Sequence, residues 1–164
     1  MIPERLAALR EKMRAYGVDA YLVPTADYHE SEYVGTYFKA RTYITGFTGS
    51  AGTAVITQDE ACLWTDGRYF VQAAKELAGT GVTLMKMGQE GVPTVEEYLA
   101  ANTKEGMTIG FDGRVVNEML GEALEKTLPE RFLSYRSDLI GEIWSDRPAL
   151  SAEPVWILDD KIYR

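Results

Sequence analysis

Residues 61–77 read ACLWTDGRYFVQAAKEL, and this stretch decides the fold that the sequence predicts. Its first five residues, 61–65, are apolar or β-prone, which is typical of a buried strand. Asp66 and Gly67 follow, a helix-capping residue and a residue that permits a tight turn. From about Arg68 to Leu77, apolar side chains recur at helical spacing. The stretch therefore predicts a strand that leads directly into a helix, which is the basic unit of an α/β fold.

The preceding residues predict more strands and helices of the same domain. Pro3 and an apolar stripe ending at Gly17 predict a first helix, and residues 20–23 predict a short buried strand. A capping-box pattern at Asp27 and Glu30 predicts a helix over about 28–38. Three β-rich runs, at 42–45, 53–57 and 61–65, are separated by short polar or glycine-rich gaps, so we expect three antiparallel neighbours.

The residues that follow Leu77 alternate between predicted strands and helices. The expected strands cover 82–87, 108–111 and 132–135, and capping residues Thr94, Asn117 and Asp138 each open a helix. Alternation of this kind requires crossover connections and parallel pairing. We therefore predict a three-layer α/β/α fold whose mixed sheet combines an antiparallel hairpin part with a parallel part.

The end of the chain differs from the rest. Residues 145–154 contain two prolines and no apolar periodicity, which is typical of a linker. A strand-like run at 155–158 has no remaining partner in the sequence. We expect one domain over 1–144, with 145–164 as a linker and the start of a second domain.

Composition narrows the class of protein. The 164 residues are 46% apolar and 26% charged, and 17 basic against 25 acidic residues give a net charge of −8. A negative charge argues against nucleic-acid and anionic-membrane partners. One cysteine and one histidine allow neither a disulfide within the chain nor a Cys/His metal cluster. No signal-like or membrane-length apolar run is seen, so we expect a cytoplasmic protein.

Arg68 is the candidate site residue. It is expected in the first helical turn, where a cation opposes the helix dipole, and such local conflicts are common at functional sites. Ligands of α/β sheets also meet the protein where strands end. The alternative is a structural ion pair between Arg68 and a carboxylate. The residues alone leave both interpretations open.

Other motifs favour structural explanations. The glycines at 46, 49 and 52 fit no phosphate-loop pattern, and a hairpin connection that needs positive φ is expected there. The acidic pairs at 59–60 and 159–160 are expected in solvent. Cys62 is expected to pack inside a strand, since a Cys62–His29 dyad would lack a third residue to orient the histidine. His29 is expected to be solvated or capping, with a ligand-facing role as its alternative.

Six stretches, in order, resemble one protein family over nearly the whole chain. They are Asp19–Pro24, His29–Tyr33, Ile44–Ala54, Leu63–Phe70, Thr83–Gly88 and Ile143–Pro148. The sequence resembles the N-terminal domain of cytosolic-type Xaa-Pro aminopeptidases (aminopeptidase P), within the creatinase/prolidase group of metallopeptidases.

The resemblance implies a ribonuclease-H-like α/β fold and a longer parent chain. That parent would add a middle domain of similar fold and a C-terminal domain with two divalent metals, commonly manganese. Its substrates would be peptides with proline at the second position. None of the metal ligands matches this chain, so no catalytic or metal-binding residue is expected in it. The family's substrate-contacting arginine maps onto Arg68, and a guanidinium suits a peptide carboxylate or carbonyl.

The resemblance therefore implies a non-catalytic domain that shapes substrate access, contributes to binding and supports assembly, including a possible homodimer. Two alternatives remain: a stand-alone peptide- or protein-binding module that has lost catalysis, and the N-terminal domain of a prolidase- or creatinase-type enzyme. The long match around residues 64–70 and 86–88 favours the aminopeptidase.

Overall fold

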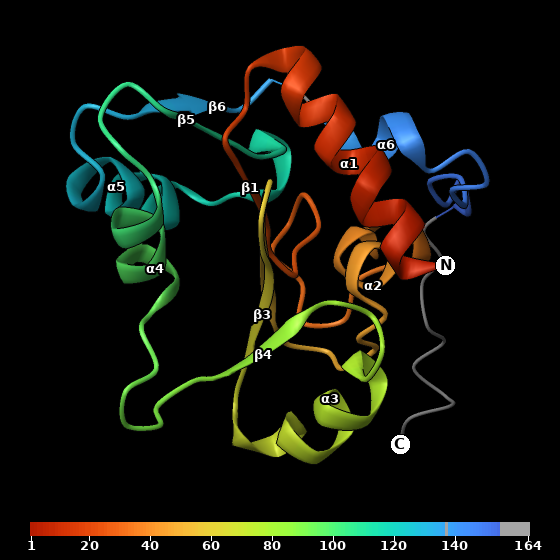
Figure 1. Cartoon of the computed structure of the whole chain (residues 1–164). Coiled ribbons are helices and arrows are strands. Elements are labelled where there is room, and N and C mark those ends of the chain that lie inside the picture. The colour runs from red at the N-terminus through yellow and green to blue at the C-terminus, as the bar shows by residue number, and fades with distance from the viewer. Residues whose placement is uncertain (137, 155–164) are drawn as a thin grey trace, which may run out of the picture.

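The computed structural model describes residues 1–136 and 138–154. These residues form a six-stranded mixed sheet, and Figure 1 shows helices on both of its sides. The sheet order is β4-β3-β2-β1-β5-β6. The strands are β1 (Ala20–Val23), β2 (Thr53–Thr57), β3 (Ala61–Thr65), β4 (Thr83–Lys86), β5 (Thr108–Gly110) and β6 (Phe132–Ser134). The helices are α1 (Ile2–Tyr16), α2 (Ala40–Thr45), α3 (Phe70–Leu77), α4 (Val95–Asn102), α5 (Glu118–Thr127) and α6 (Leu139–Ile143).

Strand directions bring most strand ends to one edge of the sheet. β2 pairs antiparallel with both β1 and β3, whereas β3 with β4, β1 with β5, and β5 with β6 pair in parallel. All strands except β2 therefore run the same way. Their carboxyl ends, and the segments that follow them, share one edge, which we call the carboxyl edge.

Alternation along the central strands builds a core on each face of the sheet. In β3, Ala61 and Leu63 pack in one apolar cluster, and Cys62 and Trp64 pack in the other, as the two-residue period of a strand requires. The first cluster is covered by α1, α2, α3 and α6, and the second by α4 and α5. Figure 1 shows α1, α2 and α6 on one side of the sheet and α4 and α5 on the other. The predicted three-layer α/β fold with a mixed sheet is confirmed.

Capping residues and glycines in the sequence predicted most helix ends correctly. Gly17 ends α1 in a left-handed conformation with φ 69°. The side chains of Thr94, Asn117 and Asp138 each accept a backbone N–H and so cap α4, α5 and α6. The helix expected from Arg68 begins as a 3₁₀ turn, η2 (Gly67–Tyr69), and continues as α3.

The helix predicted over 28–38 is wrong. The Asp27 carboxylate accepts the backbone N–H groups of His29 and Ser31, at 2.8 and 2.9 Å, and this local turn competes with a helix. Glu30 adopts a left-handed φ of 59°, which a right-handed helix does not accommodate. Helical structure here is limited to the 3₁₀ turn η1 (Thr36–Phe38).

The strand predicted at 42–45 is also wrong, because those residues belong to α2. Gly46 stops this helix with φ 83°, and the Thr45 hydroxyl donates to the carbonyl of Arg41 one turn earlier. β1 takes the expected place of 42–45 and pairs antiparallel with β2. The three β-branched or aromatic residues at 42–44 therefore follow tertiary packing rather than their strand propensity.

The glycine cluster joins α2 to β2, so the predicted hairpin connection is also wrong. Gly46 alone of the cluster has positive φ. A Cβ at Gly49 would lie 2.3 Å from Cζ of Phe47, and one at Gly52 would lie 3.0 Å from the carbonyl oxygen of Trp64. Close packing, rather than positive φ, explains these two glycines. The strand-like run predicted at 155–158 lies outside the described residues.

Candidate functional site

Arg68 lies at the carboxyl edge, directly after β3, where the sequence predicted it. The Asp66 carboxylate caps the turn by accepting the backbone N–H of Arg68 at 3.0 Å. The same carboxylate accepts from Nε and Nη2 of the Arg68 side chain, at 2.9 and 3.0 Å. Hydrogen bonds from Arg68 lower the pKa of Asp66, so the carboxylate is held ionised. Asp66 thus stabilises a cation at the start of a helix.

This ion pair leaves much of the guanidinium available. The Arg68 side chain is 64% exposed, and its Nη1 has no hydrogen-bond partner within 1–136 and 138–154. The pair joins residues two apart in one turn, so it ties no distant segments together. Exposed pairs of this kind add little stability. The geometry fits an orienting role for Asp66, with the outer nitrogen of Arg68 left to meet another molecule.

Arg68 is connected to the neighbouring loop through Tyr69. The Arg68 guanidinium carbon lies 5.1 Å from the centre of the Tyr69 ring. The Tyr69 hydroxyl is 2.5 Å from the hydroxyl of Ser50, in the loop between α2 and β2. Glu32, in the loop after β1, also contributes a favourable charge at Arg68. Segments after β1, α2 and β3 therefore meet around this arginine.

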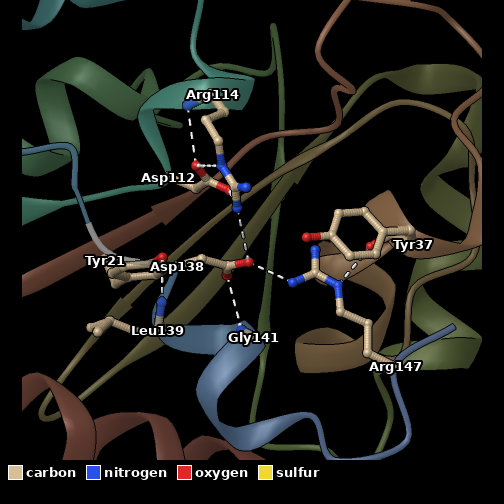
Figure 2. Close-up of polar contacts among 8 residues, drawn as sticks. All are labelled: Tyr21, Tyr37, Asp112, Arg114, Asp138, Leu139, Gly141 and Arg147. Atoms are coloured by element: carbon tan, nitrogen blue, oxygen red, sulfur yellow. Dashed lines mark hydrogen bonds and ion pairs between the residues drawn. The ribbon is translucent and has the colours of Figure 1, made fainter. Parts of the chain in front are cut away.

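A second Asp-Gly-Arg segment, at 112–114, repeats the same local geometry after β5 (Figure 2). Asp112 accepts the backbone N–H of Arg114 at 3.1 Å, and Nε and Nη2 of its side chain, both at 3.0 Å. Sequence reasoning missed this copy, although the recurrence of the tripeptide after a strand was a visible signal. Both segments stand at the carboxyl edge.

The two copies differ in what lies beyond the ion pair. Arg114 also approaches Asp138 at 3.5 Å, and Asp138 in turn binds Arg147 at 2.5 Å. Figure 2 shows Arg114, from the turn after β5, and Arg147, from the segment after α6, both directed toward Asp138 at the start of α6. The Arg147 and Asp138 side chains are only 12% and 17% exposed. Arg114 thus belongs to a charged cluster that connects the turn after β5 with the start of α6 and the segment after it, whereas Arg68 belongs to no such cluster among the described residues.

The remaining candidates lie apart from Arg68. His29 is exposed in the Asp27 turn, and Cys62 is buried in the second apolar cluster, as expected. Burial raises the pKa of the Cys62 thiol, which disfavours a reactive thiolate. Asp59 and Glu60 form the β2–β3 turn, and residues 159–160 lie outside the described residues. Among the described residues, no three His, Cys, Asp or Glu side chains gather as a metal site. No helix of that part is long and apolar enough to cross a membrane.

Sequence comparisons point to one family. The family model described as "Creatinase/Prolidase N-terminal domain" matches residues 5–143. Aminopeptidase P2 of Arabidopsis thaliana is 40% identical over 168 residues, covering 98% of this chain and 24% of the relative. A probable Xaa-Pro aminopeptidase P of Talaromyces marneffei is 44% identical, covering 94% of this chain and 24% of the relative. The chain spans about a quarter of the length of these curated relatives.

Solved structures agree with the sequence relatives. An X-prolyl aminopeptidase from Caenorhabditis elegans, described as a cytosolic enzyme with a di-nuclear active site, superposes with a TM-score of 0.88 and 37% identity. The match covers 97% of this chain and 28% of the nematode chain. The N-terminal domain of the cytoplasmic peptidase PepQ from Mycobacterium tuberculosis gives a TM-score of 0.62 at 25% identity, over 86% of this chain and 98% of that one.

Proposed function

The chain belongs to the family of creatinase/prolidase N-terminal domains, and from this we propose that it is the non-catalytic N-terminal domain of an Xaa-Pro aminopeptidase. The observation that carries the proposal is the nematode X-prolyl aminopeptidase, which matches 97% of this chain at 37% identity. The longer protein would remove the N-terminal residue of peptides that have proline at the second position. We also propose a cytoplasmic location, which the description of that relative as a cytosolic enzyme supports.

Within the longer protein, residues 1–144 would form the wall of the active-site cleft. Arg68 would contact the peptide with the part of its guanidinium that Asp66 leaves exposed. A planar cation suits a peptide carbonyl or carboxylate. Residues 145–164 would lead into the next domain. Limits on peptide length and support for subunit association, including a homodimer, belong to the same proposal.

The metal centre would be supplied from outside this chain. The nematode relative is described as having a di-nuclear active site. The described residues gather no metal site, and the chain has one histidine. These residues therefore do not fit a pair of metals, and no catalytic step is assigned to them. Manganese is the metal that we propose for the parent.

The experiment compares Arg68→Ala and Arg68→Lys with the unchanged longer protein, using an Xaa-Pro tripeptide and added manganese. We expect Arg68→Ala to raise KM, because a substrate contact is lost, and Arg68→Lys to recover part of the loss. Arg14→Ala is the matched control, since it removes an exposed guanidinium from α1 near the opposite edge. Unchanged kinetics for Arg68→Ala would remove the assigned role.

The reading frame after Arg164 tests the larger claim. A frame that continues into a domain with metal ligands supports the aminopeptidase. A frame that stops near Arg164 overturns it in favour of a peptide- or protein-binding module.

A further inference from the structure

A cavity of about 350 Å³ is lined in part by Ser50, whose hydroxyl contacts Tyr69 of the Arg68 turn. Its walls come from the loop after β1, the start of α2 and the loop that follows α2. Glu32 and Lys39 line it together with Arg41, Thr48 and Ser50. We call it the Arg41 cavity. Its volume is at the lower end of the range for small-molecule sites, roughly 300–1,000 Å³.

Arg41 is a buried cation with no carboxylate partner among the described residues. The residue is 4% exposed. Its guanidinium donates to the Thr25 hydroxyl and to the carbonyls of Phe47, Gly49 and Gly52, all of which are neutral acceptors. Its Nε is buried and has no hydrogen-bond partner in the part of the chain that the structure describes.

The pKa of the Arg41 guanidinium is consistent with a buried cation that has no carboxylate partner among the described residues. Burial lowers the pKa of its guanidinium to about 10, against a smaller opposing effect from Glu76. Glu76 does not pair with Arg41. Its carboxylate is occupied by Thr48 and Gln72. Buried charges in proteins are normally paired, because an uncompensated one is costly. The cavity thus has an unmatched positive charge in its wall.

The exposed residues at the rim of the cavity, Glu32 and Lys39, also bear on its charge. Lys39 and Glu32 are both exposed and line the same cavity. Together with Arg41, the residues that line the cavity comprise two cations and one carboxylate. Glu76 does not line the cavity, and its carboxylate already accepts hydrogen bonds from Thr48 and Gln72. An anion of small size therefore gains from entering, and a cation does not.

The cavity also adjoins the proposed substrate residue. Ser50, in its wall, is 2.5 Å from the hydroxyl of Tyr69, which follows Arg68 in the η2 turn. Glu32 lines the cavity and acts electrostatically on Arg68. A molecule that reaches the exposed side of Arg68 is therefore close to the mouth of the Arg41 cavity.

We propose that the Arg41 cavity binds the C-terminal carboxylate of a short peptide. The identity of the ligand as a peptide rests on the proposed function, whereas the preference for a carboxylate rests on the charges of the cavity. The volume suits a terminal residue with its carboxylate. The chain would thereby favour short peptides with a free C-terminus over longer or amidated ones.

The test titrates this 164-residue chain with Ala-Pro-Ala and with its C-terminal amide, followed by amide NMR. We expect the free acid to bind about tenfold more tightly than the amide, the scale of a charge-assisted hydrogen bond. The largest shifts should fall on the backbone amides of Thr48, Gly49 and Ser50. Equal binding of acid and amide, no binding of either, or shifts confined to another surface would each overturn the proposal.

Variants separate the cavity from general electrostatics. Lys39→Glu reverses a rim charge and should weaken binding of the free acid several-fold. We expect the Lys39→Glu variant to fold, because Lys39 is exposed and a negative charge at the start of α2 interacts favourably with the helix dipole. Lys104→Glu makes the same change in overall charge between α4 and β5, at the opposite edge, and should leave binding unchanged. Equal weakening by both variants would contradict a local site.

Arg41→Lys tests the buried cation directly, with its fold checked by the dispersion of the NMR spectrum. A folded variant should lose most of the preference for acid over amide, and retention of the full preference would contradict the role of Arg41. If it does not fold, the Lys39→Glu and Lys104→Glu comparison decides the proposal. These experiments measure binding to this chain and not hydrolysis. If no selective binding is found, the carboxylate proposal fails, whereas the aminopeptidase proposal is still tested separately by the kinetics of the longer protein.

Discussion

The two Asp-Gly-Arg segments are alike in their local contacts and differ in their surroundings. In each, the aspartate caps the turn and holds the arginine two residues later. Arg114 is also drawn toward Asp138, and its guanidinium lies 5.3 Å from the Tyr28 ring. Arg68 has no such second carboxylate within hydrogen-bond distance among the described residues. The same sequence motif therefore stabilises the fold at one strand end and leaves a cation available at the other.

We predict that Arg114→Ala lowers the melting temperature of this chain by about 2 °C or more, while Arg68→Ala changes it by less than about 1 °C. The difference arises because Arg114 neutralises both Asp112 and Asp138, although its 53% exposure weakens the effect through solvent screening. Thermal unfolding followed by circular dichroism measures both. A larger loss for Arg68→Ala would assign Arg68 a structural role and remove it from the candidate site.

Arg147 should contribute more to stability than either of these arginines. It binds Asp138, donates from Nε to the carbonyl of Tyr37 at 2.9 Å, and stacks 3.8 Å from the Tyr37 ring centre. Arg147→Ala should cost about 2 kcal/mol, because it leaves a mostly buried carboxylate with one fewer charged partner. Urea unfolding gives the value, and Arg147→Lys should recover part of it. A loss below about 0.5 kcal/mol would show that Asp138 is satisfied without Arg147.

At the residue scale, the sequence predicted the position of Arg68 after a strand and the capping role of Asp66, but it did not predict the burial of Arg41. The cap depends on residues two apart, so local rules suffice for it. The burial of Arg41 depends on Thr25 and on carbonyls of residues 47–52, which the fold brings together. A basic residue between an alanine and a threonine gives no local sign that it will be buried.

At the scale of elements, predictions succeeded where apolar periodicity and caps agreed and failed where the two signals competed. The Asp27–Glu30 pattern satisfies the capping-box rule, yet the Asp27 side chain closes a turn of its own. Residues 42–45 have strand propensity, yet they belong to α2, and the side chains of Tyr43 and Ile44 pack in the first apolar cluster. At Asp27 two local patterns compete, and the sequence does not show which one prevails. At 42–45 the decisive contacts are tertiary, so a local pattern does not contain them.

Two glycine substitutions should shift stability in opposite directions. Gly121 lies within α5, and a Cβ there meets no atom within 4 Å, so Gly121→Ala should stabilise by about 0.5–1 kcal/mol. Gly49→Ala should destabilise by about 1–3 kcal/mol, because its Cβ would overlap the fully buried Phe47 ring. Urea midpoints compare the two. A neutral Gly49→Ala would mean that the Phe47 ring moves aside at little cost.

At the scale of the whole molecule, the two apolar faces of the sheet explain why the layered α/β fold was predictable. Strand alternation in the sequence already assigns residues to two faces, and the amphipathic helices supply a cover for each. The order of the strands was not predictable in the same way. It places β1 between β2 and β5, a long-range pairing that sequence periodicity does not encode.

Buried titratable groups on both faces predict a loss of stability at alkaline pH. Burial raises the pKa of the Tyr21 and Tyr98 phenols, and it also raises the pKa of the Cys62 thiol. Each group keeps its proton to a higher pH in the folded chain than in the unfolded chain, where the pKa is about 10 for tyrosine and about 8.5 for cysteine. Unfolding then releases protons, so the free energy of unfolding falls as pH rises through these values. Arg41 has the opposite effect on the free energy of unfolding, because its lowered pKa makes the folded chain release a proton at a lower pH than the unfolded chain. It is a single group, whereas Tyr21, Tyr98 and Cys62 all lower the free energy of unfolding at alkaline pH.

We therefore expect the urea midpoint of this chain to decrease between pH 9 and pH 11, with each tyrosine contributing up to about 1.4 kcal/mol per pH unit above pH 10. Tyr98→Phe should flatten the decrease, because the group whose ionisation drives it is removed while the packing of its ring against Trp64 is kept. Tyr33→Phe is the control, since the Tyr33 side chain is 78% exposed and meets solvent in both states. A pH slope that is the same in both variants and in the unchanged chain would exclude Tyr98 as a source of the alkaline sensitivity. The loss would then have to come from the Cys62 thiol on the same face, or from Tyr21 on the other face, whose hydroxyl oxygen accepts the backbone N–H of Leu139.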